Sequence, residues 1–100
     1  METVKTFEDA LNEVAQDVVG LMIRKQHDYG HGNIMAFGEI GVLIRTSDKV
    51  ERLKNLLWNK SQKVQCESVM DTWADLAGYS LIALMLGKGT FTLPLRKDIK

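Results

Sequence analysis

Three acidic residues recur at every fourth position in the second half of the sequence: Glu67, Asp71 and Asp75. At about 100° of rotation per helical residue, this spacing places the three carboxylates along one side of a helix. Like charges four residues apart destabilise a helix by about 0.2–0.5 kcal/mol per pair. A divalent cation would offset that repulsion, and Mg²⁺ commonly binds through carboxylates together with substrate phosphates. We therefore interpret the series as a candidate metal site.

A simpler alternative is that Glu67 and Asp71 only interact with the positive end of the helix dipole, while Asp75 lies on a solvated face. Asp75 argues against this alternative, because it lies two turns into the helix, beyond the range of the dipole's end. The same side of the helix continues with Gly78 and Ile82, which should face protein. We therefore expect the acids to point into a cleft.

A second set of charged residues borders the apolar face of the preceding segment: Arg45, Asp48, Lys49 and Arg52, at i, i+3, i+4 and i+7. Asp48 is positioned to join the metal ligands, and Glu51 adds an acid one turn away. Lys49 and Arg52 are suited to hold phosphate oxygens. The alternative is a solvated helix edge with intrahelical pairs such as Asp48 with Arg52.

The third candidate feature is the end of the first helical segment. Lys25 and Tyr29 continue its apolar line, and a charge in such a place needs a partner. With Asp28 and the loop residue Asn33, they would form a polar rim that hydrogen-bonds and stacks on a nucleobase. The alternative is that Lys25 extends to the surface and Tyr29 packs on the core.

The elements that must position these residues are three helices. We predict the first from Thr6 to about His27, the second from about Gly38 to Trp58, and the third from about Val64 or Glu67 to Leu86. Apolar residues of the first segment follow the i, i+3, i+4, i+7 spacing of an amphipathic helix; they are Phe7, Ala10, Leu11, Val14, Val18, Leu21 and Met22.

The connections are predicted from their glycines and polar residues. A loop is expected at residues 30–33, and Gly87 and Gly89 should close the third helix. The segment 46–48 could cap a new helix and divide the second one, but we favour a continuous helix. Trp73 and the methionines have core spacing and are expected to pack inside. The tail 90–95 contains Pro94, which suits an extended edge or an arm on a neighbour.

Composition limits the class of protein. With 100 residues, 45% of them hydrophobic, the chain should form one domain, residues 1–100, with an all-α fold in which the helices pack as an antiparallel bundle. A core of this size buries only about two-thirds of the unfolded chain's surface, so we expect dimerisation to complete it.

Lys+Arg and Asp+Glu are equal at 13 each, which argues against binding a nucleic-acid polymer. No long apolar run predicts a membrane span, and we expect a cytoplasmic protein.

Taken together, three motifs resemble the short, often phage-borne nucleotide-modification-associated domain. They are Lys25-x-x-Asp28-Tyr29-Gly30, Arg45-x-x-Asp48-Lys49-x-x-Arg52-Leu53 and Glu67-x-x-x-Asp71-x-x-x-Asp75-x-x-x-Tyr79. That group is similar to the MazG-like all-α nucleoside triphosphate pyrophosphohydrolases. The resemblance covers roughly residues 25–85 and implies a helical bundle, usually dimeric, that binds Mg²⁺ through carboxylates on two helices. The wider pattern of E-x-x-E and E-x-x-D becomes Asp48-x-x-Glu51 and the acidic series here.

We therefore expect a Mg²⁺-dependent (deoxy)nucleoside triphosphate pyrophosphohydrolase, with Mn²⁺ as an alternative ion. Its metal ligands would be Asp48, Glu67, Asp71 and Asp75, and its catalytic groups Lys49, Glu51 and Arg52. Its nucleotide-binding residues would be Lys25, Asp28, Tyr29, Asn33 and Arg45. The expected partners are a nucleoside triphosphate and further copies of the chain, in the host cytoplasm if a phage encodes it. The alternatives are a non-catalytic nucleotide-binding module and a helical protein-interaction domain.

Overall fold

The computed structural model describes residues 6–59 and 68–96, and within these ranges it contains helices and no strands. The helices are α1 (Phe7–Tyr29), α2 (Gly32–Leu53), a one-turn π-helix η1 (Lys54–Trp58) that continues α2, and α3 (Val69–Lys88). The predicted all-α fold with three main helices is confirmed.

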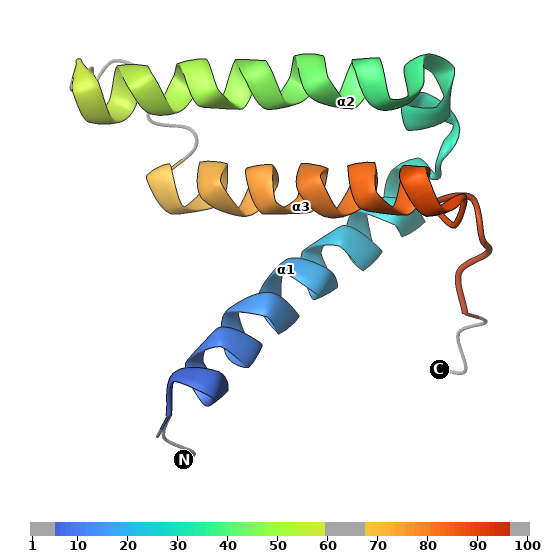
Figure 1. Cartoon of the computed structure of the whole chain (residues 1–100), viewed down its shortest axis with the longest axis horizontal. Helices are drawn as coiled ribbons and strands as arrows, with labels where there is room; N and C mark the ends of the chain where they lie inside the picture. Colours follow the sequence, from blue (N-terminus) through green and yellow to red (C-terminus); the bar gives the residue numbers. More distant parts are fainter. Residues whose placement is uncertain (1–5, 60–67, 97–100) are drawn as a thin grey trace.

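Two of the helices form an antiparallel pair, as predicted. Figure 1 shows α2 and α3 side by side along most of their lengths, with opposite directions. The C-terminal half of α1 crosses α3 obliquely and packs on it, whereas the N-terminal half of α1 diverges from both other helices. The Cα radius of gyration is 15.6 Å, compared with about 13 Å for a compact domain of this length. The three helices thus form an open arrangement.

Local side chains explain where the helices begin and end. The Thr6 hydroxyl accepts a hydrogen bond from the Asp9 N–H at 3.0 Å, and the Ser68 hydroxyl accepts one from the Asp71 N–H at 3.0 Å. Each bond satisfies an N–H group that has no partner within its helix. At the other end of α3, Gly89 adopts left-handed backbone angles (φ 73°, ψ 25°) and donates its N–H to the Leu86 carbonyl. Glycine takes this conformation at the least cost, so α3 ends there.

The start of the second helix differs from the prediction. The structure begins α2 at Gly32, so Asn33 lies in its first turn instead of in a loop. Gly38, about where the second helix was predicted to begin, has non-helical angles (φ 62°, ψ −148°), so it separates a short helical segment at residues 32–37 from the long part of α2. The helix then continues through residues 46–48, which confirms the single helix favoured over a split. The predicted start of the third helix, at 64 or 67, lies outside the described residues.

The buried apolar core is small. Among the described residues, its members are Val18, Val42, Leu53 and Phe91. Phe91 comes from the C-terminal tail and is buried against its own chain, and residues 90–96 form no strand.

Several residues expected in the core are exposed. Phe7, Leu11 and Val14 of α1 are exposed because this half of the helix has no neighbour among residues 6–59 and 68–96. The predicted packing of Trp73 and the methionines is also wrong for most of them, because the exposed residues include Trp73, Met35, Met70 and Met85. Periodicity identified these positions as apolar, but the chain leaves them uncovered.

Among the described helices, α3 is the one whose length and composition would allow it to cross a bilayer. The predicted absence of a membrane span considered only uninterrupted apolar runs, whereas α3 reaches this criterion as a whole helix despite Asp71 and Asp75. The central helix of a water-soluble bundle meets the same criterion.

The two glycines near the end of α3 give a matched test of its C-cap. Replacing Gly89 with Ala should destabilise the protein by about 1–2 kcal/mol, because an L-residue is strained in the left-handed region. Replacing Gly87, which is helical, should stabilise it by roughly 0.5–1 kcal/mol. Neither new Cβ would meet another atom within 4 Å, so packing does not differ. Urea denaturation of both variants measures the two changes, and changes of equal sign would contradict the assigned cap.

Candidate functional site

The carboxylate of Asp75 receives two lysines from two different helices. Lys49 Nζ of α2 lies 3.0 Å from Asp75 Oδ2, and Lys25 Nζ of α1 lies 3.2 Å from Asp75 Oδ1. The Asp75 side chain is only 11% exposed, whereas those of Lys49 and Lys25 are 22% and 49% exposed. Asp75 is thus the point at which all three helices are joined through charge.

Burial explains why Asp75 needs these partners. Moving a carboxylate out of water is costly unless opposite charges or hydrogen bonds replace the lost solvation. The solvated face that was the alternative for Asp75 does not exist in the structure, because α1 and α2 cover that side of α3. The prediction that the acidic series points toward protein is correct for this residue. For Lys25, the expectation that its charge needs a partner is also correct, because its Nζ pairs with Asp75.

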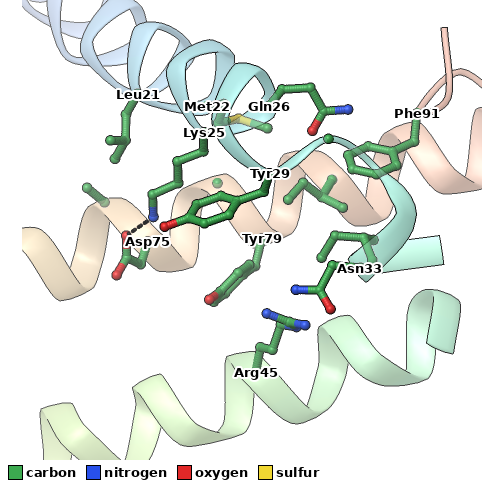
Figure 2. A pocket seen from close by; sticks show the side chains of 15 residues that line it. Leu21, Met22, Lys25, Gln26, Tyr29, Asn33, Arg45, Asp75, Tyr79 and Phe91 are labelled. Carbon is green, nitrogen blue, oxygen red and sulfur yellow. Dashed lines mark hydrogen bonds and ion pairs between the residues drawn. The ribbon is translucent and has the colours of Figure 1, made fainter. Parts of the chain in front are cut away.

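Beside Asp75, a pocket of about 280 Å³ opens between the three helices. Figure 2 shows its side chains converging from α1, α2 and α3, with Phe91 of the tail at one end. Its wall combines apolar and polar groups: Leu21, Met22, Lys25, Gln26, Tyr29, Gly30, Asn33, Ile34, Arg45, Ala74, Asp75, Gly78, Tyr79, Ile82 and Phe91. Gly78 is buried where α1 packs on α3, and a Cβ there would lie 3.5 Å from Met22 Cγ, an ordinary van der Waals contact.

The polar groups of this pocket suit a ligand with a flat ring and negative charge. Tyr29 and Tyr79 offer ring faces for stacking, and the amides of Gln26 and Asn33 can each donate and accept hydrogen bonds. The Arg45 guanidinium reaches toward the pocket from α2, on the side of Tyr79 and Asn33 (Figure 2). A guanidinium binds phosphate or carboxylate oxygens through two parallel hydrogen bonds. Groups suited to stacking, to hydrogen bonding and to binding an anion therefore surround one cavity.

The structure brings together part of the predicted site. Lys25, Tyr29, Asn33, Arg45 and Asp75 line the pocket, and Lys49 joins them through Asp75. Other predicted residues are exposed and do not line it: Asp28, Asp48, Glu51 and Asp71. Arg52 is half-buried on α2, one turn beyond Lys49. Glu67 lies outside the described residues.

The described carboxylates suit only one way of binding a metal. No three Asp, Glu, His or Cys side chains in residues 6–59 and 68–96 are grouped closely enough to hold an ion. Asp71 and Asp75, on successive turns of α3, supply two carboxylates. Mg²⁺ typically binds through one or two carboxylates, several waters and substrate phosphates. A Mg²⁺ ion here would therefore have to be shared with a phosphate ligand, and it would compete with the two lysines for the oxygens of Asp75.

Two polar residues of the pocket were not predicted as part of the site. No sequence pattern distinguishes Gln26 from an ordinary surface glutamine, and its place in the pocket wall becomes clear only when α1 packs on α3. Tyr79 is one turn beyond Asp75 in the acidic series, and this continuation of the same face was the available signal.

The two ion pairs of Asp75 should contribute unequally to stability. Double-mutant cycles with Asp75→Asn and either Lys25→Met or Lys49→Met would measure each coupling. We expect about 0.2–1 kcal/mol for the exposed Lys25 pair. The less solvated Lys49 pair should exceed about 1 kcal/mol, because hydrogen bonds to charged groups strengthen as water is excluded. A Lys25 coupling equal to or larger than that of Lys49 would contradict the role of burial.

Comparison with known proteins supports a link to nucleotides. No curated protein and no solved structure matches the chain. The model of one family, described as nucleotide modification associated domain 1, matches residues 25–86. This range contains every polar side chain of the pocket, from Lys25 on α1 to Tyr79 on α3, whereas Leu21, Met22 and Phe91 of its wall lie outside it. The chain therefore belongs to the nucleotide modification associated domain 1 family.

Proposed function

We propose that this domain is a Mg²⁺-dependent nucleoside triphosphate pyrophosphohydrolase, which converts a canonical or modified (deoxy)nucleoside triphosphate to the monophosphate and pyrophosphate. Family membership indicates a role in nucleotide modification. The more specific activity is proposed from the similarity of the chain's motifs to those of MazG-like enzymes. We also propose a cytoplasmic location, that of the host if a phage encodes the chain, because nucleoside triphosphates are found there.

The observation that carries the proposal is the position of Asp75. Its carboxylate forms part of the pocket wall and lies on the same side of α3 as Asp71. Ring faces and amides lie on one side of it, and the cations Lys25 and Lys49 contact it directly. A nucleotide bound with its base between the tyrosines would direct its phosphates toward these charges.

In this arrangement, side chains of the domain would bind the nucleotide and neutralise the charge of its phosphates. Tyr29 and Tyr79 would hold the base by stacking, and Gln26 and Asn33 would hydrogen-bond its edge. Arg45, Lys49 and Arg52 would bind phosphate oxygens and stabilise the negative charge that develops during hydrolysis. These cations lie in a row along one edge of α2, at i, i+4 and i+7, so each could contact a different phosphate of the triphosphate.

The chemical step would be hydrolysis at the α-phosphorus. A water oxygen forms a bond to this phosphorus while the bond to the bridging oxygen of pyrophosphate breaks. A carboxylate that does not bind metal, such as Glu51, would accept the proton of the attacking water. Asp71 and Asp75 would hold Mg²⁺, or Mn²⁺ in its place, with Glu67 and Asp48 as further candidates. The ion, when bound, lowers the pKa of a coordinated water and neutralises phosphate charge.

The test is a panel of canonical and modified nucleoside triphosphates incubated with the protein and Mg²⁺, with separation of monophosphate, diphosphate, pyrophosphate and phosphate. We expect equal amounts of monophosphate and pyrophosphate from the preferred substrate. Asp71→Asn should abolish Mg²⁺-dependent turnover with little effect on the melting temperature, because this side chain is exposed.

Glu13→Gln is a suitable control for the loss of one negative charge, because Glu13 is an exposed residue of α1 outside the pocket. This variant should keep the wild-type rate. Full activity in the Asp71 variant would remove Asp71 from the metal site, and phosphate with diphosphate as products would contradict a pyrophosphohydrolase.

A non-catalytic nucleotide-binding module is the second candidate. It is favoured by the charge balance at Asp75, because each oxygen of its carboxylate is already paired with a lysine. Such a module would bind the nucleotide in the same pocket and release it unchanged. A melting temperature that rises with nucleotide, by mass action, while no product forms across the panel would favour this candidate over the enzyme.

A further inference from the structure

Phe91 of the C-terminal tail separates two cavities. It lines the pocket beside Asp75, and it also lines a second cavity of about 670 Å³, which lies between α1, the end of α3 and the tail. Met22 and Gln26 line both cavities too, but Phe91 is the buried member of the three, with 5% of its surface exposed. The Phe91 side chain is therefore the main part of the wall between the two cavities.

The backbone that follows α3 holds Phe91 in place. The Thr90 N–H donates a hydrogen bond to the Met85 carbonyl at 2.9 Å, and the Thr90 hydroxyl donates to the same carbonyl at 3.3 Å. On the other side of Phe91, the Leu93 N–H donates to the Thr90 carbonyl at 3.2 Å, which folds the tail into a turn. Bonds of this kind satisfy carbonyl groups at the end of a helix and fix the direction in which the chain leaves it. The position of Phe91 is thus determined by the end of α3.

Phe91 lies far from the charges of the pocket. Figure 2 shows Phe91 at one end and the ion pair of Lys25 with Asp75 at the other, with Tyr29 and Tyr79 between them. A nucleotide with its phosphates toward the charged groups and its base between the tyrosines would point its base toward Phe91. The edge of the base that is remote from the sugar would then face this side chain.

The pocket leaves little room beyond a base. Its volume of about 280 Å³ is slightly below the range of roughly 300–1,000 Å³ that is usual for small-molecule sites. The larger cavity begins directly behind Phe91. Removing the ring would join the two cavities, so the size of this one side chain limits the length of the ligand.

We propose that Phe91 determines the largest base that the pocket accepts, because its ring closes the end that the base faces. This inference rests on the proposed function, since it needs a nucleotide in the pocket. The preferred substrates would be triphosphates whose base is unsubstituted, or carries only a small group, at the edge remote from the sugar.

The family match separates this role from the recognition of other parts of the nucleotide. The matched range ends at residue 86 and contains every polar side chain of the pocket, whereas Phe91 lies beyond it. Hydrogen bonding and charge therefore come from the matched range, and the limit on size comes from the tail that follows it.

Nucleotides that differ only at this edge test the proposal. Adenine, cytosine, guanine and thymine each carry an exocyclic nitrogen or oxygen there, so a benzyl group can be added to whichever base the wild type prefers. Calorimetric titration with α,β-methylene triphosphates, whose bridge the proposed hydrolysis cannot cleave, measures Kd with and without the benzyl group. The wild type should bind the benzyl analogue about tenfold more weakly or worse, because a closed pocket rejects added volume.

Phe91→Ala should remove this discrimination, so that the benzyl analogue binds at least as tightly as the unsubstituted nucleotide. Phe91→Leu keeps an apolar side chain in the core and disturbs folding less, and it should show the same change to a smaller degree. The matched control is Leu93→Ala, because Leu93 belongs to the same tail, is 63% exposed and lines the second cavity without lining the first. This variant should discriminate as the wild type does.

A wild type that binds the benzyl analogue as tightly as the unsubstituted nucleotide would overturn the inference, and this measurement requires no variant to fold. A folded Phe91 variant with unchanged discrimination, or equal relief in the Leu93 variant, would also overturn it. In each of these cases the unsubstituted nucleotide still binds, so the proposed function stands. A wild type that binds no triphosphate at all would overturn both proposals.

Discussion

The carboxylate of Asp75 imposes the main constraint on this fold. It is nearly buried in the centre of a helix that is otherwise strongly apolar, and such a charge is stable only with opposite charges nearby. The structure supplies one lysine from α1 and one from α2. This requirement fixes how the helices are rotated about their axes, because both lysines must point to the same turn of α3. The pocket results from the same rotation, since it opens beside this turn.

Hydrophobic burial contributes less than is usual for 100 residues. Among the described residues, few apolar side chains are buried, and several large ones on α1 and α3 are exposed. The apolar surface is divided between two sides of α3: one side holds α1 and α2 around the pocket, and the other remains uncovered. The inner side also forms part of the pocket wall, through Ala74, Asp75 and Gly78.

Much of the fold follows from local signals in the sequence. The periodicity of α1 and the caps at Thr6 and Gly89 specify their helices through short-range contacts, which a sequence displays directly. The helical residues before Gly38 were missed because Gly30 and Gly32 indicated a loop there. Trp73 was wrongly placed in the core because α3 is apolar on nearly all sides. Periodicity cannot then tell which side meets the same chain.

The site was predictable where spacing on one helix determined it. The i+4 series placed Asp75 correctly toward the protein, but only the packing of three helices shows that two lysines neutralise it. The central claim is that a nucleoside triphosphate with Mg²⁺ binds beside this carboxylate. Amide NMR shifts on adding Mg²⁺ and a non-hydrolysable triphosphate analogue test it most directly. We predict shifts centred on Tyr29, Asp75 and Tyr79, whereas shifts confined to other surfaces, or none at saturating analogue, would contradict the account.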